Sequence, residues 1–480
     1  MQTDCKQNVF EFQGLGQRKV TVDFSGGYLS SDGGGLFLRE VEQRRGLIRR
    51  LADCFVDQRD ARYVEHSVEE LLRQRVFALS LGYEDLNDHD RLRLDPLHAL
   101  LAGKADITGA DRALERDKGK ALAAHATLNR LELSAHGTDG RYKKIAPDAA
   151  KIAALLLAEG VRAIARRTRE IVLDFDATDD PLHGAQEGAF FHGYYRHYCY
   201  LPLYCFCGNI PLLARLRDCK RDASEGTVDA LEKIVAAIRR RFGKKVRVIV
   251  RADSGFAREE IMAWCEAHGI YYCVGLARNE RLSGQLAESF GALHRQIELG
   301  EAVAPCRQFA DFEYRTLKSW SRARRVIGKA EVLAKGDNPR FVVTSLPAEG
   351  FGGAADGARL TAAVVYEQLY CARGDMENRI KEQQQDLFAG RTSTHWLAAN
   401  QLRLWFSAFA HLLLSVLRAE VLHGTALAHA SLGQIRLQLF KIAARIKISC
   451  RRIHCELASA YPWQTLFAKA LRRSTALAGA

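Results

Sequence analysis

Three acidic residues, far apart in the sequence, are of the type that binds divalent metal ions. Asp176 lies in VLDFDATDD, Asp253 in VRVIVRADSGF and Glu377 in YEQLYCARGDMENRIK. They are separated by 77 and 124 residues, so they meet only if the chain folds back on itself. Three carboxylates and a bound phosphate are a sufficient ligand set for two Mg²⁺ ions, which prefer oxygen ligands. We therefore expect Asp176, Asp253 and Glu377 to be catalytic and to bind Mg²⁺, with Mn²⁺ as a substitute.

The charge of the chain favours a polyanionic partner. The 480 residues carry a formal net charge of +13, and an apolar fraction of 48% supports sizeable cores. From residue 391 onward there are twelve Lys and Arg residues against two acids. A phosphodiester backbone fits both this charge and a two-metal site. We expect double-stranded DNA to be the partner, with the C-terminal segment facing its phosphates.

The two aspartates lie where strands are expected to end. IVLDFDA and VRVIVRAD are typical of buried strands, and the order from residue 168 is strand, strand, strand, helix, strand, helix, strand. This order is expected of a ribonuclease H-like α/β core, in which the first and fourth strands are parallel neighbours. Asp176 and Asp253 then leave the sheet at one edge, where open α/β sheets bind ligands. Asp174 points to the same side of its strand as Asp176 and is an alternative first ligand.

Helical spacing groups polar side chains around Glu377. If each residue advances the helix by roughly 100°, Tyr370, Arg373, Glu377 and Lys381 fall within a sector of about 80°. An amphipathic helix usually turns apolar residues toward the core on such a face, so this face is predicted to line the site. Arg373 and Lys381 then bind the flanking phosphates. The alternative is a solvated helix face with a Glu–Lys pair four residues apart.

The residues Asp176-x-Thr178, Asp253 and Tyr370-x2-Arg373-x3-Glu377 resemble those of DDE insertion-sequence transposases with a Y-R-E-K helix. DFDATDDPLHGAQEGAFFHGYY and RADSGF are most similar to the insertion-sequence family thirteen-eighty, a relative of the insertion-sequence-four superfamily. The similarity covers nearly the whole chain. It implies a ribonuclease H-like core with a β insertion between the second Asp and the Glu. The family pattern places a Lys where this chain has Gln384, and Lys381 is an alternative source of that charge.

Two further basic segments are predicted to contact DNA. Residues 314–329 contain six Lys and Arg, no acid, and Trp320. The resemblance implies that Trp320 stacks on a base flipped out at the transposon end, whereas packing onto the core is the alternative. In RIKISCRRI, strand alternation puts Arg445, Lys447 and Arg451 on one face. The predicted DNA-binding residues are Tyr370, Arg373, Lys381, Trp320, Arg322, Arg324, Arg325, Arg445, Lys447 and Arg451.

Other groupings are interpreted as structural. The glycine-rich segment 25–35 has no GK[ST] after it, so a surface turn before the helix LFLREVEQRRGLIRRL is expected. The spacing of His183, His192 and His197 is not that of a zinc site, and Cys205-x-Cys207 has no second pair. WFSAFAHLLLSVL is shorter than a membrane span and predicts a buried core helix. We also expect no secretory signal and reduced thiols.

Two helices in the N-terminal region have recognisable starts. A capping box from Ser67 to Glu70 precedes one helix, and Thr127 is expected to cap another that carries Asn129 and Arg130. Together they form either a DNA-reading module or a solvated helical hairpin.

The expected fold is α/β: a ribonuclease H-like mixed sheet core with a β-rich insertion, a mainly helical N-terminal DNA-binding region, and a helical, basic C-terminal region. The expected parts are residues 1–165 (DNA-end binding), 166–277 (core, first part), 278–363 (β-rich insertion), 364–424 (core, second part, with the Glu helix) and 425–480 (DNA binding and dimerisation).

The predicted function is that of a DNA transposase. It is expected to bind the inverted-repeat ends of an insertion sequence and to cleave and transfer strands with a Mg²⁺-dependent DDE triad. We expect a homodimer in the synaptic complex, a cytoplasmic, nucleoid-associated location in a bacterium, and no membrane partner. One alternative is a ribonuclease H-like nuclease or resolvase, which cleaves without joining. The other is a non-catalytic DNA-binding repressor derived from a transposase.

Overall fold

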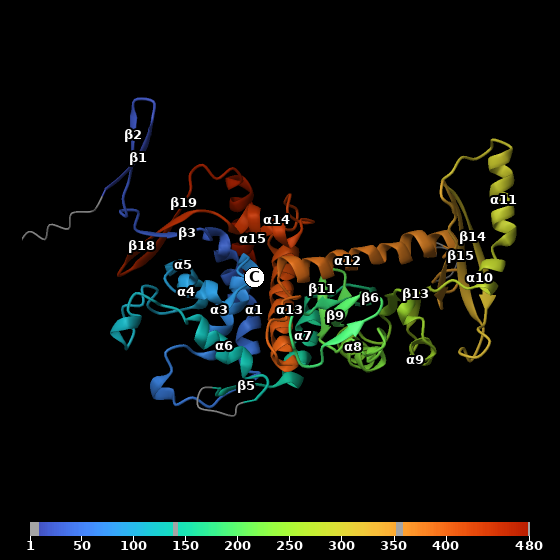
Figure 1. Ribbon diagram of the computed structural model, residues 1–480, viewed down its shortest axis with the longest axis horizontal. Helices are drawn as coiled ribbons and strands as arrows, with labels where there is room; N and C mark the ends of the chain where they lie inside the picture. The colour runs from blue at the N-terminus through green and yellow to red at the C-terminus, as the bar shows by residue number, and fades with distance from the viewer. Residues whose placement is uncertain (1–8, 138–142, 352–358, 479–480) are drawn as a thin grey trace, which may run out of the picture. The chain divides into compact units, whose positions relative to one another are not determined.

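The computed structural model describes residues 9–137, 143–351 and 359–478, and the chain divides into two compact units (Figure 1). Unit 1 combines Met1–Asp148 with Leu413–Ala480, and unit 2 is the continuous stretch Ala149–Leu412. All three candidate carboxylates belong to unit 2. The candidate site is therefore contained in one unit.

Unit 2 is built on a mixed sheet of nine strands among the described residues. In spatial order these are β11 (Ile210–Arg215), β10 (Leu203–Cys207), β6 (Glu170–Ala177), β12 (Arg247–Ala252), β13 (Tyr271–Leu276), β17 (Arg340–Thr344), β15 (Arg324–Leu333) and β14 (Cys306–Tyr314), with β16 (Gly336–Asp337) paired to β15. Strands β6, β12 and β13 are parallel, and β10 and β11 are antiparallel additions. The expected parallel pairing of the two Asp-bearing strands is confirmed.

Both faces of this sheet are buried, because successive apolar residues along a strand point to opposite faces. Ile171, Leu173 and Phe175 of β6 pack in one cluster with side chains of α7 (Ala149–Ala163), α8 (Thr227–Phe242) and α9 (Glu259–Ala267). On the other face, Val172 and Ile249 pack with Val365. Each fully buried side chain of this size contributes about 1.5–3 kcal/mol, so the core holds the strand ends firmly in place.

Segment 278–363 extends the same sheet. Strand β17 pairs antiparallel with β13, and β15 and β14 follow outward. The prediction of short β-like segments was incomplete, because the segment also contains helices α10 (Glu280–Gly284) and α11 (Ala287–Glu298). Their buried Leu282 and Leu293 pack into the main core cluster. The β-rich part is thus continuous with the core sheet, where it pairs with the backbone edge that β13 would otherwise expose.

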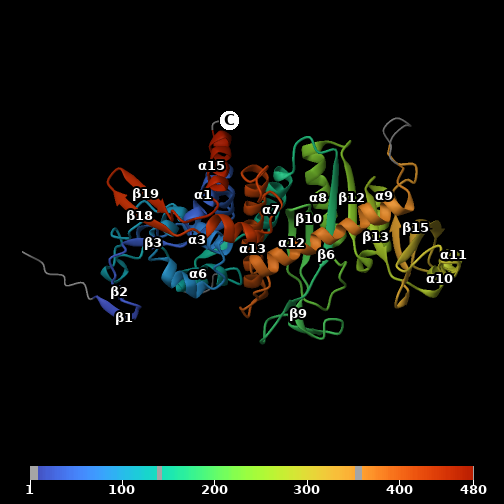
Figure 2. The same cartoon turned by 90° about the horizontal axis from the view of Figure 1, so that it is seen from above.

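The segment that carries Glu377 changes its helical geometry three times. A π-helix over Val364–Tyr370 is followed by a 3-10 turn over Cys371–Arg373, by α12 (Gly374–Lys381) and by a second π-helix over Glu382–Asp386. Figure 2 shows this segment, in orange, running along the sheet beside β6 and β13. The expectation of one regular helix was wrong here. π-Turns are rare and frequently occur at functional sites.

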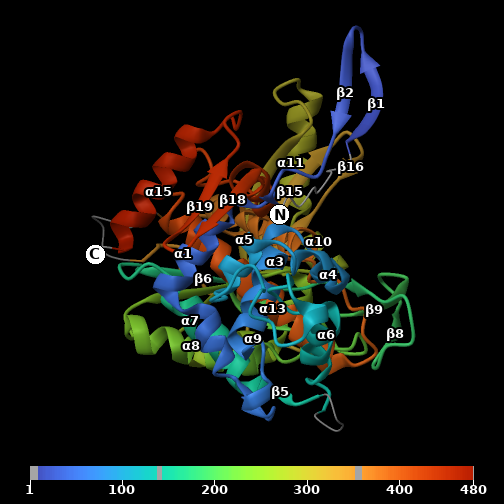
Figure 3. The ribbon, with the colours of Figure 1, turned by 90° about the vertical axis from the view of Figure 1, so that its left-hand side faces the viewer.

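A small second sheet extends from unit 2. Its order is β7 (Asp180–Pro181), β9 (His197–Tyr200), β8 (Phe190–His192). Strands β8 and β9 form a hairpin that projects from the body of the unit in Figures 2 and 3. Arg196, at the end of the connecting loop, has a φ of 61°. The hairpin starts at Phe190, thirteen residues beyond the end of β6 at Ala177.

The long helix α13 (Leu397–Glu420) is apolar and buried. It is the one helix among the described residues that is long and apolar enough to span a membrane, and 89% of its most apolar window is buried in the protein. The prediction of a buried helix for 405–417 is confirmed.

Unit 1 combines helices and short strands. The helices are α1 (Leu36–Arg45), α2 (Leu47–Ala52), α3 (Val68–Leu81), α4 (His89–Leu92), α5 (Pro96–Ala102), α6 (His125–Leu133), α14 (Leu432–Ile435) and α15 (Gln464–Ala478). The strands are β1 (Phe10–Leu15), β2 (Arg18–Val22), β3 (Tyr28–Ser30), β4 (Phe55–Asp57), β5 (Ile145–Pro147), β18 (Ala444–Ser449) and β19 (Arg452–Leu457).

The predicted helix starts in unit 1 had mixed outcomes. The capping box of α3 is confirmed, with both Ser67 and Glu70 side chains bonded to the backbone. Thr127 is not a cap, because α6 begins at His125. The segment expected to form one helix from residue 36 is broken at Gly46, whose φ of 58° ends α1. The glycine provides the left-handed conformation that closes the helix.

The glycine-rich segment 25–35 is exposed over residues 25–29, but its end before α1 is buried, so the expected surface turn directly before the helix was wrong. Gly33, Gly34 and Gly35 form a buried 3-10 turn. A Cβ added to Gly34 would overlap the carbonyl oxygen of Leu439, so only glycine allows this approach. The preceding Asp32 is fully buried, and its carboxylate contacts Tyr83, His98 and Lys441 at 2.7, 3.0 and 2.7 Å. These contacts join the early and late segments of unit 1.

Candidate active site

The ends of β6 and β12 bring Asp176 and Asp253 together. Arg251 of β12 lies opposite Asp174 of β6, and this register, continued by two residues, sets Asp253 beside Asp176. Asp253 follows β12 directly, and its carboxylate accepts a 2.9 Å hydrogen bond from the amide of Gly255. Asp176, Asp253 and Glu377 all line one cavity of about 660 Å³, which we call the carboxylate pocket.

Arg373 bridges two of the three carboxylates. Its guanidinium donates to Asp176 Oδ2 at 3.4 Å and to Glu377 Oε1 at 3.0 Å. Glu377 is exposed, whereas Asp176 and Arg373 are mostly buried. The arginine therefore supplies positive charge in the middle of an acidic cluster.

The electrostatics of the pocket disfavour an isolated negative charge on Asp176. Burial raises the pKa of Asp176 to about 7; Arg373 opposes this rise, and the carboxylates of Asp253 and Glu377 add to it. Opposed carboxylates in a half-closed cavity favour the binding of an added cation. A perturbed acid of this kind is frequently found at functional sites.

Asp174, the alternative first ligand, is held elsewhere. Its two carboxylate oxygens accept bonds of 2.7 and 2.8 Å from Arg251, which also donates to the carbonyl of Leu369. Burial raises the pKa of Asp174, and the hydrogen bond from Arg251 opposes that rise. Asp174 does not line the carboxylate pocket, so the geometry favours Asp176 as the first ligand.

The four residues placed on one helix face do not all reach the pocket. Arg373, Glu377 and Lys381 line it, but Tyr370 does not. Tyr370 instead lies against Gly275 of β13: a Cβ there would be 2.5 Å from its hydroxyl oxygen and 3.0 Å from the amide of Ser254. The change from π to 3-10 geometry between 370 and 373 departs from 100° per residue, which explains the difference.

Gln384 has a clear structural partner that sequence reasoning missed. Its amide donates to Asp180 Oδ1 at 2.8 Å and to the carbonyl of Asp179 at 3.0 Å. Burial raises the pKa of Asp180 to about 7, opposed by this bond from Gln384. The pair connects the segment after Asp176 to the helix that carries Glu377. The only sequence signal was the departure from the Lys of the family pattern.

The basic residues of segment 314–329 are mostly neutralised inside unit 2. Arg324 is 1% exposed and pairs with Glu259 and Glu266 of α9 at 2.6 and 2.8 Å. Arg325 pairs with Asp311 at 2.5 Å. Acids elsewhere in unit 2 thus compensate the charge of both arginines, and the DNA-binding role predicted for them stays a prediction that these ion pairs do not favour.

Trp320 and Arg322 differ in exposure. Trp320 is 4% exposed and packs edge-to-face on Tyr314 at 5.8 Å, so the structure favours the packing alternative over base stacking. Arg322 is exposed and lies 3.3 Å from Glu266. Of the three arginines predicted here, Arg322 is the one whose side chain is mostly exposed.

The C-terminal basic residues lie in unit 1. Arg445 and Lys447 are exposed on one face of β18, and Lys447 pairs with Glu456 at 2.6 Å. Arg451 lies in the turn before β19, so the prediction that it shares their strand face was wrong. The hairpin closes at Ser449 and Arg452, which leaves Arg451 at its tip.

The residues of the pocket fit a divalent metal ion. As the side chains lie, no group of three or more His, Cys, Asp and Glu in the described ranges is arranged to hold a metal, and Arg373 lies between Asp176 and Glu377. The donor set is nevertheless carboxylate oxygen alone, which is the chemistry that Mg²⁺ and Mn²⁺ prefer. The cysteines in the described part of the chain are free thiols.

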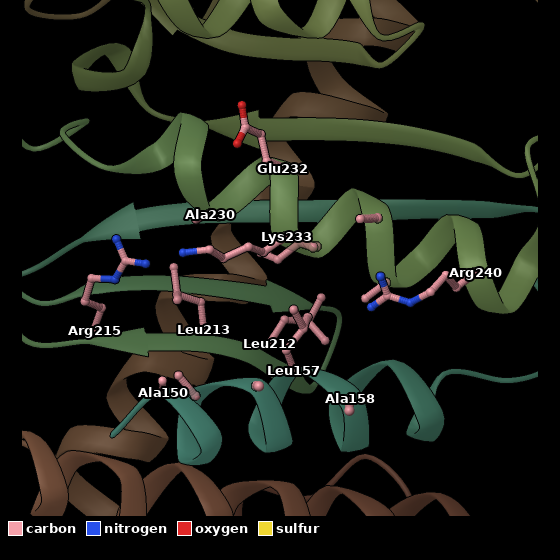
Figure 4. Close-up of a pocket in the computed structure, with 15 residues that line it drawn as sticks. Ala150, Leu157, Ala158, Leu212, Leu213, Arg215, Ala230, Glu232, Lys233 and Arg240 are labelled. Atoms are coloured by element: carbon pink, nitrogen blue, oxygen red, sulfur yellow. The ribbon is translucent and has the colours of Figure 1, made fainter. Parts of the chain in front are cut away.

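A second cavity of about 560 Å³ lies between α7, α8 and the edge strand β11 (Figure 4). Leu157, Leu212 and Leu213 line it, with Arg215 and Lys233 among its charged residues. It contains no group of acids and no nucleophile, so it offers no chemistry comparable to that of the carboxylate pocket.

Comparison with known proteins identifies the family. A family model described as Transposase DDE domain group 1 matches residues 12–478. The chain belongs to this family. It is a DDE transposase, an enzyme of DNA transposition and recombination, and such enzymes in general use divalent metal ions.

Other comparisons add little. No curated protein matches the chain. The cryo-EM structure of a piggyBac transposase synaptic complex with hairpin DNA is similar at 9% identity and a TM-score of 0.39, covering 85% of this chain and 79% of that chain. A similarity of this size carries no argument about the site.

Proposed function

We propose that this transposase binds the inverted-repeat ends of an insertion sequence and cleaves and joins DNA strands at the carboxylate pocket. The observation that supports this most is the convergence of Asp176, Asp253 and Glu377 on one cavity, at the ends of two parallel strands and on one helical segment. Lys381 lines the same cavity and adds a cation for the polyanionic substrate. The three carboxylates hold Mg²⁺, and Mn²⁺ substitutes.

The chain's own residues have distinct roles in this proposal. Asp176, Asp253 and Glu377 would hold the divalent ions, which would supply activation of a water or a 3′-hydroxyl and stabilisation of the leaving oxygen. Arg373 and Lys381 bind the phosphates that flank the scissile bond. Gln384 and Asp180 orient the Glu377 helix against the end of β6 through their 2.8 Å hydrogen bond. The amide of Gly255 holds the Asp253 carboxylate toward the cavity.

The finer classification is also proposed. Parallel β6 and β12 with antiparallel β10 and β11 support a ribonuclease H-like core. The Asp-x-Thr, Asp and Tyr-Arg-Glu motifs support the insertion-sequence family thirteen-eighty.

Joining two element ends requires a synaptic complex, for which we propose a homodimer on double-stranded DNA. We propose that it acts in the cytoplasm, with the nucleoid. The exposed Arg445 and the tip residue Arg451 are proposed to bind DNA phosphates.

The experiment uses the full-length chain and DNA that carries the sequences flanking its coding region. Wild-type protein with Mg²⁺ or Mn²⁺ is expected to nick at the element ends and to join them to a target plasmid. Asp253→Asn is expected to bind the same DNA but to lose both steps. Asp229→Asn, at an exposed ion pair with Arg215, is the matched control and is expected to keep both.

Each contrary outcome identifies one alternative. Cleavage by Asp253→Asn at the wild-type rate refutes the proposed triad. Cleavage by the wild type without any strand transfer supports a nuclease or resolvase. End binding by the wild type without cleavage in either metal supports a non-catalytic repressor.

A further inference from the structure

The tip of the β8–β9 hairpin carries a concentration of aromatic side chains that the proposed mechanism does not use. Tyr194 is 84% exposed, and Phe191 and Tyr198 are each more than half exposed. Large aromatic side chains grouped in solvent commonly mark an interaction site. The hairpin is therefore a candidate binding surface.

The rings of this hairpin are already ordered against one another. Tyr194 meets Tyr195 edge-to-face with 5.0 Å between ring centroids, and Tyr195 meets His192 at 4.9 Å. Phe191 lies directly across the hairpin from Tyr198, with centroids 5.7 Å apart. A pre-ordered aromatic surface loses little conformational entropy when a flat ligand stacks on it.

This aromatic surface is continuous with the carboxylate pocket. His192, Tyr194 and Tyr195 line the same cavity as Asp176 and Asp253. His197, paired with His192 at the loop end of the hairpin, has its Nε2 2.7 Å from Asp179, three residues after Asp176. A DNA strand whose phosphate lies at the carboxylates therefore passes the hairpin tip.

The chemistry of the tip selects a nucleobase as its ligand. The ring of Tyr194 is accessible for stacking because the residue is 84% exposed, and Arg196, two residues further on, supplies an exposed cation for a sugar-phosphate backbone. Stacking of unpaired bases on aromatic rings is the common means of holding single-stranded DNA. Trp320, which the resemblance assigned to this task, is buried.

We propose that the β8–β9 hairpin, through Tyr194, stacks on an unpaired nucleobase next to the phosphate that the carboxylate pocket cleaves. This inference rests on the proposed function for its location, but base stacking is measurable without cleavage. The stacked base is held out of the duplex, which allows the neighbouring phosphate to approach the carboxylates.

The test compares two fluorescent DNA probes with full-length protein in EDTA, where no cleavage occurs. One probe is a blunt duplex, and the other is the same duplex with a three-base unpaired tail. The wild type is expected to bind the tailed probe more tightly, on the order of tenfold. Tyr194→Ala is expected to lose this preference, and Tyr194→Trp to keep it, because only the π-face is needed.

Two controls separate stacking from other contacts. Tyr63→Ala removes a tyrosine that is 79% exposed in unit 1 and is expected to leave the preference unchanged. A tail of abasic sugar-phosphates is expected to lose the preference with the wild type, because its bases are gone and its charge is not.

The inference is overturned if Tyr194→Ala still prefers the tailed probe, or if it lowers the affinity for both probes by the same factor. It is also overturned if Tyr194→Ala changes only the oligomeric state in light scattering, since the surface would then contact a second copy. Failure of the proposed function gives a different result: wild-type protein that shows the tail preference yet never cleaves end DNA in Mg²⁺.

Discussion

Asp174 and Asp176 are two residues apart on one strand, and the structure predicts opposite consequences for their substitution. Asp174 is bound through both oxygens to Arg251, and both side chains are buried. Asp176 faces Asp253 and Glu377 across the carboxylate pocket. Asp174→Asn is therefore expected to destabilise unit 2, whereas Asp176→Asn is expected to abolish cleavage and leave stability unchanged or increased.

The size of the first effect follows from the buried ion pair. Asparagine preserves the shape of Asp174 but leaves the guanidinium of Arg251 buried without its counter-charge. Breaking one partner of a buried pair costs about 3–5 kcal/mol. For a unit of this size, about 2–4 °C is lost per kcal/mol, so the melting temperature is expected to fall by roughly 10 °C.

The measurement is differential scanning calorimetry of the full-length chain in EDTA. Asp229→Asn is the matched control, because its partners Arg215 and Lys233 are partly exposed and such pairs contribute only about 0–1 kcal/mol. A melting temperature for Asp174→Asn within about 2 °C of the control refutes the reasoning. Equal destabilisation by Asp174→Asn and Asp176→Asn refutes it as well.

Three further predictions concern pH, packing and metal. Burial raises the pKa of Asp32, but His98 and Lys441 lower it to about 2, below its usual 3.8. The charged carboxylate therefore contributes about 2 kcal/mol to the free energy of unfolding above pH 4, and this contribution is lost as the pH falls through 2. In denaturation experiments, the difference in unfolding free energy between wild type and Asp32→Asn is expected to disappear there. Gly34→Ala is expected to prevent unit 1 from folding, because the added Cβ overlaps a backbone carbonyl. The control is Gly284→Ala, whose Cβ meets nothing within 4 Å, and its free energy of unfolding in urea is expected to stay within about 1 kcal/mol of wild type. Excess Mg²⁺ at 100 times its Kd is expected to stabilise wild type by about 2.7 kcal/mol and Asp253→Asn by much less, and an equal gain in both would contradict the metal assignment.

The location of the candidate site was predictable from the sequence because it depends on local patterns. Asp176 and Asp253 end apolar strand segments, and their separation of 77 residues equals the register offset of β6 and β12. Glu377 could be placed on a facing helix by its spacing from Arg373. Tyr370 could not, because sequence periodicity does not reveal a π-to-3-10 transition.

Charge compensation was not predictable, since it depends on tertiary contacts. Residues 314–329 contain no acid, yet Arg324 pairs with Glu259 and Glu266, which lie 65 and 58 residues earlier on α9. The same limit applies to Asp174, whose partner Arg251 is 77 residues away. A basic segment therefore predicts a DNA surface only where the fold leaves its charges unpaired.

The composition of unit 1 has a consequence for protein synthesis. Unit 2 is a continuous stretch, so all of its residues have left the ribosome before those that complete unit 1. Asp32 and Gly34 find their partners Lys441 and Leu439 only when more than four hundred further residues have been made. A chain cut short after residue 412 therefore keeps every residue of the carboxylate pocket while the early segment of unit 1 lacks its partners.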